Sequence, residues 1–113
     1  MKEFTNEQIN KNFGMIFQEY RLKKNLTQEK LAEDLLKSTK TISQIETAKD
    51  GTSKKTDIDL MNLLGITPNL LYKNFITNEE LKQKIYLSEK IENLSPEKIE
   101  AVIKIIDVIN DIK

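Results

Sequence analysis

Five hydrogen-bonding side chains recur with helical spacing in a short segment near the centre of the chain. Residues 38–47 contain two isoleucines three apart, Ile42 and Ile45, which predict the buried stripe of a helix with Ser38 as its N-cap. The opposite face of that helix offers hydroxyl, amide and ammonium groups from Thr39, Lys40, Ser43, Gln44 and Thr47. Such a surface can bind the edges of base pairs, because amides recognise adenine and cations recognise guanine.

The chain offers little for other kinds of chemistry. Its 113 residues include no cysteine and no histidine, which excludes disulfides, thiol catalysis and the usual zinc ligands. It has no glycine-rich phosphate loop, and acidic pairs such as Glu79-Glu80 and Asp57/Asp59 are better explained as charges at the starts of helices. We therefore expect no enzymatic activity, no catalytic or metal-binding residue and no cofactor.

Positive charge gathers around the polar helix although the net charge of the chain is zero. Residues 21–55 contain nine Lys or Arg against five Asp or Glu, and the acidic balance lies outside this segment. Lys49, Lys54 and Lys55 flank a polar loop, and such cations contact phosphates in nucleic-acid complexes. Ordinary solvated surface charge would give the same count, so charge alone does not decide between these interpretations.

The sequence contains no sign of a membrane or export segment. No stretch reaches the roughly eighteen consecutive apolar residues that suggest a membrane helix. The first ten residues, MKEFTNEQIN, lack the apolar core of a signal peptide. Together with the absence of cysteine, these features predict a cytoplasmic protein with no membrane partner.

A second short helix is predicted directly before the polar one. Thr27 is its expected N-cap, and Leu31 and Leu35 lie four apart on its inner side. The small Ala32 between them would let another helix cross closely. Residues 26–46, LTQEKLAEDLLKSTKTISQIE, are therefore expected to form two helices joined by a tight turn.

These residues resemble the helix-turn-helix of the lambda-repressor-like, XRE-type regulators: TQ, then LA four residues in, then S-x-x-TIS-x-IE. The resemblance extends from about Phe13 to Tyr72 and implies a DNA-binding domain of five helices. It departs at the turn, where the family usually has glycine in place of Leu36 and an apolar residue in place of Lys37. Because a non-glycine residue with positive φ costs about 1 kcal/mol or more, we expect a reshaped turn.

The resemblance also implies roles for residues outside the polar face. Gln28 matches a family glutamine that binds backbone phosphate, at a helix end whose dipole favours anions. Arg21, the only arginine in the chain, matches an arginine that pairs with the glutamate ending the second helix, here Glu46. We expect a partly buried ion pair between these two residues. The alternative is that Arg21 contacts a phosphate at the surface.

Cap signals predict the remaining helices. The expected ranges are about residues 6–24, 56–64, 67–72, 78–93 and 95–112. With the two central helices they give an all-α fold: a five-helix lambda-repressor-like DNA-binding domain in residues 1–74, followed by a C-terminal two-helix hairpin in residues 75–113. The last helix is rich in β-branched residues, but its cap and its three-four spacing favour a helix over a strand.

The last predicted helix is apolar over most of its circumference, so it needs partners on two sides. We expect homodimerisation through it, by the apolar residues Ile99, Val102, Ile103, Ile106 and Ile109. The alternative is that this helix packs back on the first domain.

These patterns predict a sequence-specific transcriptional regulator, with repression as the expected effect, that binds a two-fold operator in double-stranded DNA as a dimer. A protein or peptide regulator could control the dimer. The alternative function is a protein-interaction module, such as an antitoxin or the partner of an antirepressor, in which the last two helices bind another protein.

Overall fold

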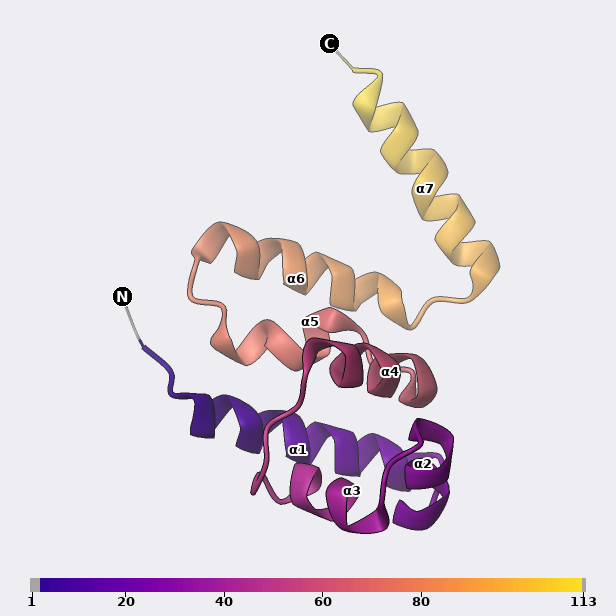
Figure 1. The fold of residues 1–113 in the computed structure, drawn as a ribbon. Coiled ribbons are helices and arrows are strands. Elements are labelled where there is room, and N and C mark those ends of the chain that lie inside the picture. Colours follow the sequence, from indigo (N-terminus) through magenta and orange to yellow (C-terminus); the bar gives the residue numbers. More distant parts are fainter. Residues whose placement is uncertain (1–2, 113) are drawn as a thin grey trace. The chain divides into compact units, whose positions relative to one another are not determined.

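The computed structural model describes residues 3–112 as helices joined by short connections, and it has no strand in this range. The chain divides into two compact units, one ending at Ile76 and one beginning at Thr77. The first unit contains α1 (Asn6–Lys23), α2 (Gln28–Leu35), α3 (Thr39–Glu46), α4 (Lys54–Leu64), α5 (Pro68–Tyr72) and the short 3-10 helix η1 (Lys73–Phe75). The second contains α6 (Glu79–Glu92) and α7 (Pro96–Asn110) (Figure 1). The expected all-α fold class is confirmed.

Every α-helix in the described range begins at a polar side chain that accepts a hydrogen bond from a backbone N–H of the first turn. The caps are Thr5, Thr27, Ser38, Ser53, Thr67, Asn78 and Ser95. At α1 the bonding is reciprocal, because the Gln8 side chain also accepts from the Thr5 backbone at 2.9 Å. Each cap satisfies a donor that the helix itself leaves free, which explains why local sequence decides where these helices begin.

The start of α4 differs from the expectation. The sequence suggested Thr56, but the helix begins two residues earlier, at Lys54. The hydroxyl of Ser53 accepts from the Thr56 backbone at 3.1 Å and thereby caps the earlier start. Lys54 and Lys55 consequently lie in the first turn of α4 rather than in the loop before it.

A single apolar core holds the first unit together. Its buried members come from every α-helix of the unit and are Phe13, Phe17, Leu31, Ala32, Ile42, Ile45, Leu60, Leu64, Ile66 and Leu71. Helix α3 packs against both α1 and α2. The approach to α1 is closest at Gly14, where an added Cβ would overlap the carbonyl oxygen of Ile45 and lie 2.9 Å from that of Glu46. Glycine therefore allows α3 to rest directly on α1.

Helices α1, α2, α3 and α4 end in the same way, with a residue of positive φ directly after the helix. These residues are Asn25, Leu36, Ala48 and Gly65, with φ of 57°, 56°, 61° and 70°. In each case the next N–H bonds a carbonyl five residues back, as Lys37 does to Ala32 at 2.9 Å and Lys49 does to Gln44 at 2.8 Å. This is the Schellman motif, which satisfies carbonyls at the helix end.

The turn between α2 and α3 is not reshaped, so that expectation was wrong. Leu36 adopts the left-handed conformation, with φ of 56° and ψ of 43°, that glycine adopts more easily. Its side chain is 94% exposed, so burial within the chain does not offset the strain. After α3 the left-handed residue is Ala48 rather than Gly51.

The first unit extends slightly past the boundary suggested by the sequence. Phe75 in η1 packs against the rings of Phe4 and Phe13, with centroids 5.0 and 6.3 Å apart. These contacts attach residues after position 74 to the core, and the unit ends at Ile76.

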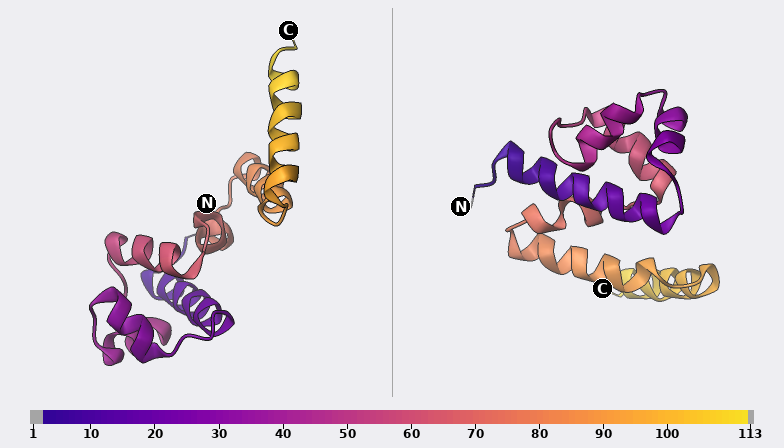
Figure 2. Two further views of the ribbon diagram at one scale, coloured as in Figure 1. Left: turned by 90° about the vertical axis from the view of Figure 1, so that its right-hand side faces the viewer. Right: turned by 90° about the horizontal axis from the view of Figure 1, so that it is seen from below.

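The two helices of the second unit meet at a wide angle (Figures 1 and 2). No residue of α6 or α7 is buried. This arrangement differs from the closed hairpin that we expected, in which the two apolar faces would cover each other. Because apolar side chains surround most of α7, a single neighbouring helix cannot cover them all.

Candidate nucleic-acid interface

The polar face of α3 is available at the surface. Ile42 and Ile45 anchor the opposite side, with exposed fractions of 1% and 6%. This anchoring turns the five polar side chains outward together: Thr39, Lys40 and Thr47 are exposed, and Ser43 and Gln44 are half-buried. We call these five residues the recognition face.

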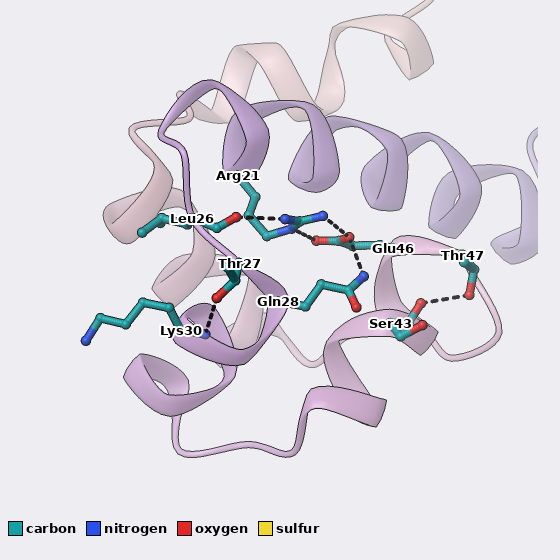
Figure 3. A network of polar contacts seen from close by, with 8 residues as sticks. All are labelled: Arg21, Leu26, Thr27, Gln28, Lys30, Ser43, Glu46 and Thr47. Carbon is teal, nitrogen blue, oxygen red and sulfur yellow. Dashed lines mark hydrogen bonds and ion pairs between the residues drawn. The ribbon is translucent and has the colours of Figure 1, made fainter.

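The groups on the recognition face differ in how far the protein already engages them. The Thr47 hydroxyl donates to the carbonyl oxygen of Ser43 at 2.8 Å, so its remaining capacity is as an acceptor (Figure 3). Within residues 3–112 the Lys40 ammonium and the Gln44 amide have no hydrogen-bond partner. These two side chains are therefore the ones most able to bind an external group.

A buried polar network fixes the C-terminal end of α3. The Arg21 Nε donates to Glu46 Oε2 at 2.7 Å, and Arg21 Nη2 donates to Glu46 Oε1 at 3.1 Å. The side chains are 8% and 1% exposed. The ion pair suggested by the family resemblance is thus present, with the bidentate geometry that a guanidinium permits and an ammonium does not.

The same network reaches α2 and the connection before it. The Gln28 amide donates to Glu46 Oε1 at 3.0 Å, and Arg21 Nη1 donates to the carbonyl oxygen of Leu26 at 2.7 Å (Figure 3). One carboxylate therefore accepts three hydrogen bonds from two helices. This arrangement ties the end of α3 to α1 and to the beginning of α2, which sets the direction of the recognition face.

Sequence analysis missed the contact between Gln28 and Glu46. Only the spatial approach of α2 to α3 reveals it, since the two residues are eighteen positions apart. One amide hydrogen of Gln28 is used in this bond, and the Thr27 hydroxyl caps the same end of α2 by accepting from Lys30 at 3.0 Å. The beginning of α2 consequently presents backbone N–H groups beside a fixed amide.

The three lysines expected to contact phosphate lie near α3 in the chain but in different surroundings. Lys49 follows the left-handed Ala48 and is exposed, and Lys54 is exposed in the first turn of α4. The Lys55 ammonium lies 2.8 Å from Asp59 Oδ2 in a surface ion pair. Such an exposed pair is weak and exchanges readily with other partners.

A buried carboxyl anchors the loop that carries Lys49. The Thr52 hydroxyl donates to Asp57 in α4. Burial raises the pKa of the Asp57 carboxyl above its usual range, and the bond from Thr52 opposes that rise. Asp57 therefore holds the loop from below and does not belong to the recognition face.

The residues expected to mediate dimerisation lie on α7. Ile99 and Val102 are half-buried, whereas Ile103, Ile106 and Ile109 are 51%, 43% and 57% exposed. In the part of the chain that the structure describes, no group of acidic, histidine or cysteine side chains is arranged to hold a metal ion. No helix among the described residues is long and apolar enough to cross a membrane.

Two short helices joined by a tight turn, the second presenting an exposed polar face, define the helix-turn-helix class of DNA-binding proteins. The family model described as Helix-turn-helix matches residues 17–71, which include all of α2, α3 and α4. The chain accordingly carries an XRE-type, lambda-repressor-like helix-turn-helix domain, from a family of DNA-binding transcriptional regulators. No curated protein and no solved structure gives a significant match.

Proposed function

We propose that this protein is a sequence-specific transcriptional repressor that binds a two-fold operator in double-stranded DNA as a dimer in the cytoplasm. One observation supports the proposal most directly. The Lys40 and Gln44 side chains are unengaged on the exposed face of α3, while the buried Glu46 carboxylate fixes the same helix from behind. A rigid helix with free hydrogen-bonding groups is what recognition of base edges requires.

In this proposal α3 enters the major groove. The Gln44 amide makes a bidentate contact with adenine, and the Lys40 ammonium donates to the acceptors of guanine. Thr39, Ser43 and Thr47 contact neighbouring base edges or phosphates. The hydroxyl of Thr47 acts there as an acceptor, because its hydrogen is directed to the Ser43 carbonyl.

Phosphate contacts position the domain on the duplex without reading its sequence. The beginning of α2 supplies free backbone N–H groups and the Gln28 amide, whose second hydrogen remains available for a phosphate oxygen. Lys49, Lys54 and Lys55 add positive charge on the other side of α3. Lys55 would exchange its partner Asp59 for a phosphate.

Dimerisation through α7 would present two recognition helices to one operator. The half-exposed apolar residues Ile103, Ile106 and Ile109 support this step, since their surface is not covered within the described chain. A two-fold dimer binds half-sites about one helical turn apart, roughly 34 Å. Occupying an operator in this way hinders other proteins from using the same DNA, which is why we propose repression.

Selection of bound duplexes from a random pool would return the operator and its symmetry. On that operator, Gln44→Ala should lose about 1–3 kcal/mol at one base pair and relax the preference there. Lys49→Ala should weaken all duplexes alike and reduce the salt dependence of binding. The control is Lys23→Ala, since this lysine lies on α1 in an exposed pair with Glu19.

Equal, sequence-independent losses from Gln44→Ala and Lys49→Ala would contradict the assignment of the recognition face. A protein that ignores every duplex at low salt would contradict DNA recognition altogether. That result would favour the alternative of a protein-interaction module.

A further inference from the structure

Helix α7 carries two apolar seams rather than one. The first, seam A, comprises Ile99, Val102, Ile106 and Ile109, and the second, seam B, comprises Ala101, Ile105, Val108 and Ile112. Within each seam the spacing alternates between three and four residues, as in the core positions of a coiled coil. On a helix of 3.6 residues per turn, the seams lie about a third of the circumference apart.

Both seams are open within the described chain. Ile106 and Ile109 of seam A are 43% and 57% exposed. In seam B, Ile105, Val108 and Ile112 are 60%, 65% and 72% exposed. Dimerisation through seam A therefore leaves seam B in water, where a row of large aliphatic side chains is unfavourable.

The charge on the rest of α7 indicates what kind of surface could cover these seams. Its narrow polar stripe consists of Lys104 and the four acidic residues Glu97, Glu100, Asp107 and Asp111. Helices that lie on membranes carry lysine and arginine in such a stripe, because lipid surfaces are anionic. The acidic stripe disfavours both a membrane and nucleic acid, and favours an apolar protein surface.

The available area argues against a dimer joined by one seam alone. A fully buried aliphatic side chain removes on the order of 100 Å² from water, and those of seam A are already partly covered. Two α7 helices paired along seam A would bury roughly 400 Å², well below the about 1,200 Å² of a stable interface. Using both seams in four helices raises the buried area to roughly 1,600 Å², which reaches the stable range.

We propose that α7 helices from four copies of this chain form a bundle, in which seam A pairs two copies and seam B joins two such pairs. The β-branched composition agrees with this assembly, since isoleucine at both kinds of core position favours more than two strands. The acidic stripes would remain at the outside of the bundle. The inference rests on the proposed function in taking the seam A pair as the DNA-binding dimer.

The consequence is that one particle holds two pairs of DNA-binding domains. It could bind two operators at once, and the first binding event would raise the effective concentration of the second operator. Seam B would then control bridging of two duplexes without contributing to the binding of one.

The experiment measures the mass of the full chain by analytical ultracentrifugation over a wide range of concentration, with and without duplex. We expect the tetramer mass for the unaltered protein. The double variant Ile105→Lys, Val108→Lys should halve that mass, keep its affinity for a single operator, and lose the ability to bridge two duplexes of different lengths. Asp107→Lys on the polar stripe is the matched control and should remain a tetramer.

A second double variant, Val102→Lys, Ile106→Lys, tests seam A and should also reduce the mass below that of the tetramer. Retained circular dichroism shows that α7 is still folded in each variant. An unaltered protein that never exceeds the dimer mass, or a seam B variant that stays a tetramer, would overturn the proposal. A tetramer that binds no duplex would instead support the assembly and overturn the proposed DNA-binding function.

Discussion

The two units of this chain differ in what holds them in shape. The first has a buried apolar core and a buried ion pair that joins helices far apart in sequence. The second has no buried residue among those described, and its ion pairs are exposed links within single helices, such as Lys84–Glu80 and Lys104–Glu100. The first unit therefore completes its packing within one chain, whereas the second leaves most of its apolar surface for other molecules.

This difference suggests a division of labour. Recognition of DNA needs side chains held at fixed positions, and the first unit supplies that rigidity through Glu46 and the core below α3. Assembly needs apolar surface that remains available, and α7 supplies it. The cost of an altered side chain should accordingly depend on the unit in which it lies.

The largest expected effect comes from removing the carboxylate of Glu46. Glu46→Ala leaves the Arg21 guanidinium buried without its partner, which costs about 3–5 kcal/mol of stability. It also releases Gln28 from α3, so operator affinity should fall as well. Urea unfolding followed by circular dichroism measures the first effect, and titration of a labelled duplex measures the second.

The matched change in the second unit is Glu100→Ala, which breaks the exposed pair with Lys104. Surface pairs of this type contribute about 0–1 kcal/mol, so the urea midpoint should barely move. Equal losses from Glu46→Ala and Glu100→Ala would contradict the distinction between the two units.

The local features of the fold could be predicted from the sequence because they depend on neighbouring residues. Thr5, Thr27, Ser38 and Ser95 cap helices where expected, since a side-chain oxygen needs only the N–H three residues on. Ile42 and Ile45 are buried, which left the recognition face outside as the helical spacing had indicated. The pair of Arg21 and Glu46, twenty-five positions apart, was expected only from the resemblance to a family.

The remaining features depend on packing that a single segment does not encode. The bond from Gln28 to Glu46 needs the mutual position of α2 and α3, and the wide angle between α6 and α7 depends on surfaces distributed over both helices. The left-handed Ala48 and Leu36 were missed for a different reason. Their side chains disfavour that conformation, and the Schellman hydrogen bonds impose it nonetheless.

An intermediate effect is expected where α1 and α3 touch. Gly14→Ala places a methyl group against the carbonyl oxygens of Ile45 and Glu46, and backbone cannot yield as a side chain can. Overpacking of this kind costs about 1–3 kcal/mol, and we expect the upper part of that range. Because α3 must shift, operator affinity should fall together with the urea midpoint.

The control is Gly51→Ala, where the added methyl would meet the side-chain amide of Asn10 instead of backbone. That side chain can turn away, so the loss of stability should be clearly smaller. If Gly14→Ala unfolds no more easily than Gly51→Ala, α3 is not held as closely as the structure indicates.

The smallest effect is a gain of stability, at the turn between α2 and α3. Leu36→Gly removes the strain of a side chain at positive φ, so the free energy of unfolding should rise by about 1 kcal/mol. Leu36→Ala keeps the strain and removes the exposed side chain, so it should leave stability nearly unchanged. Gly65→Ala is the reverse test: its φ is +70° and its Cβ would meet only Lys24 at 3.9 Å, so the loss should be similar in size and due to the backbone alone. Thermal melts of the three variants measure these differences, and equal stability of Leu36→Gly and Leu36→Ala would show that this turn is not strained by its leucine. Operator affinity should stay unchanged in Leu36→Gly, because the glycine retains the turn that directs α3.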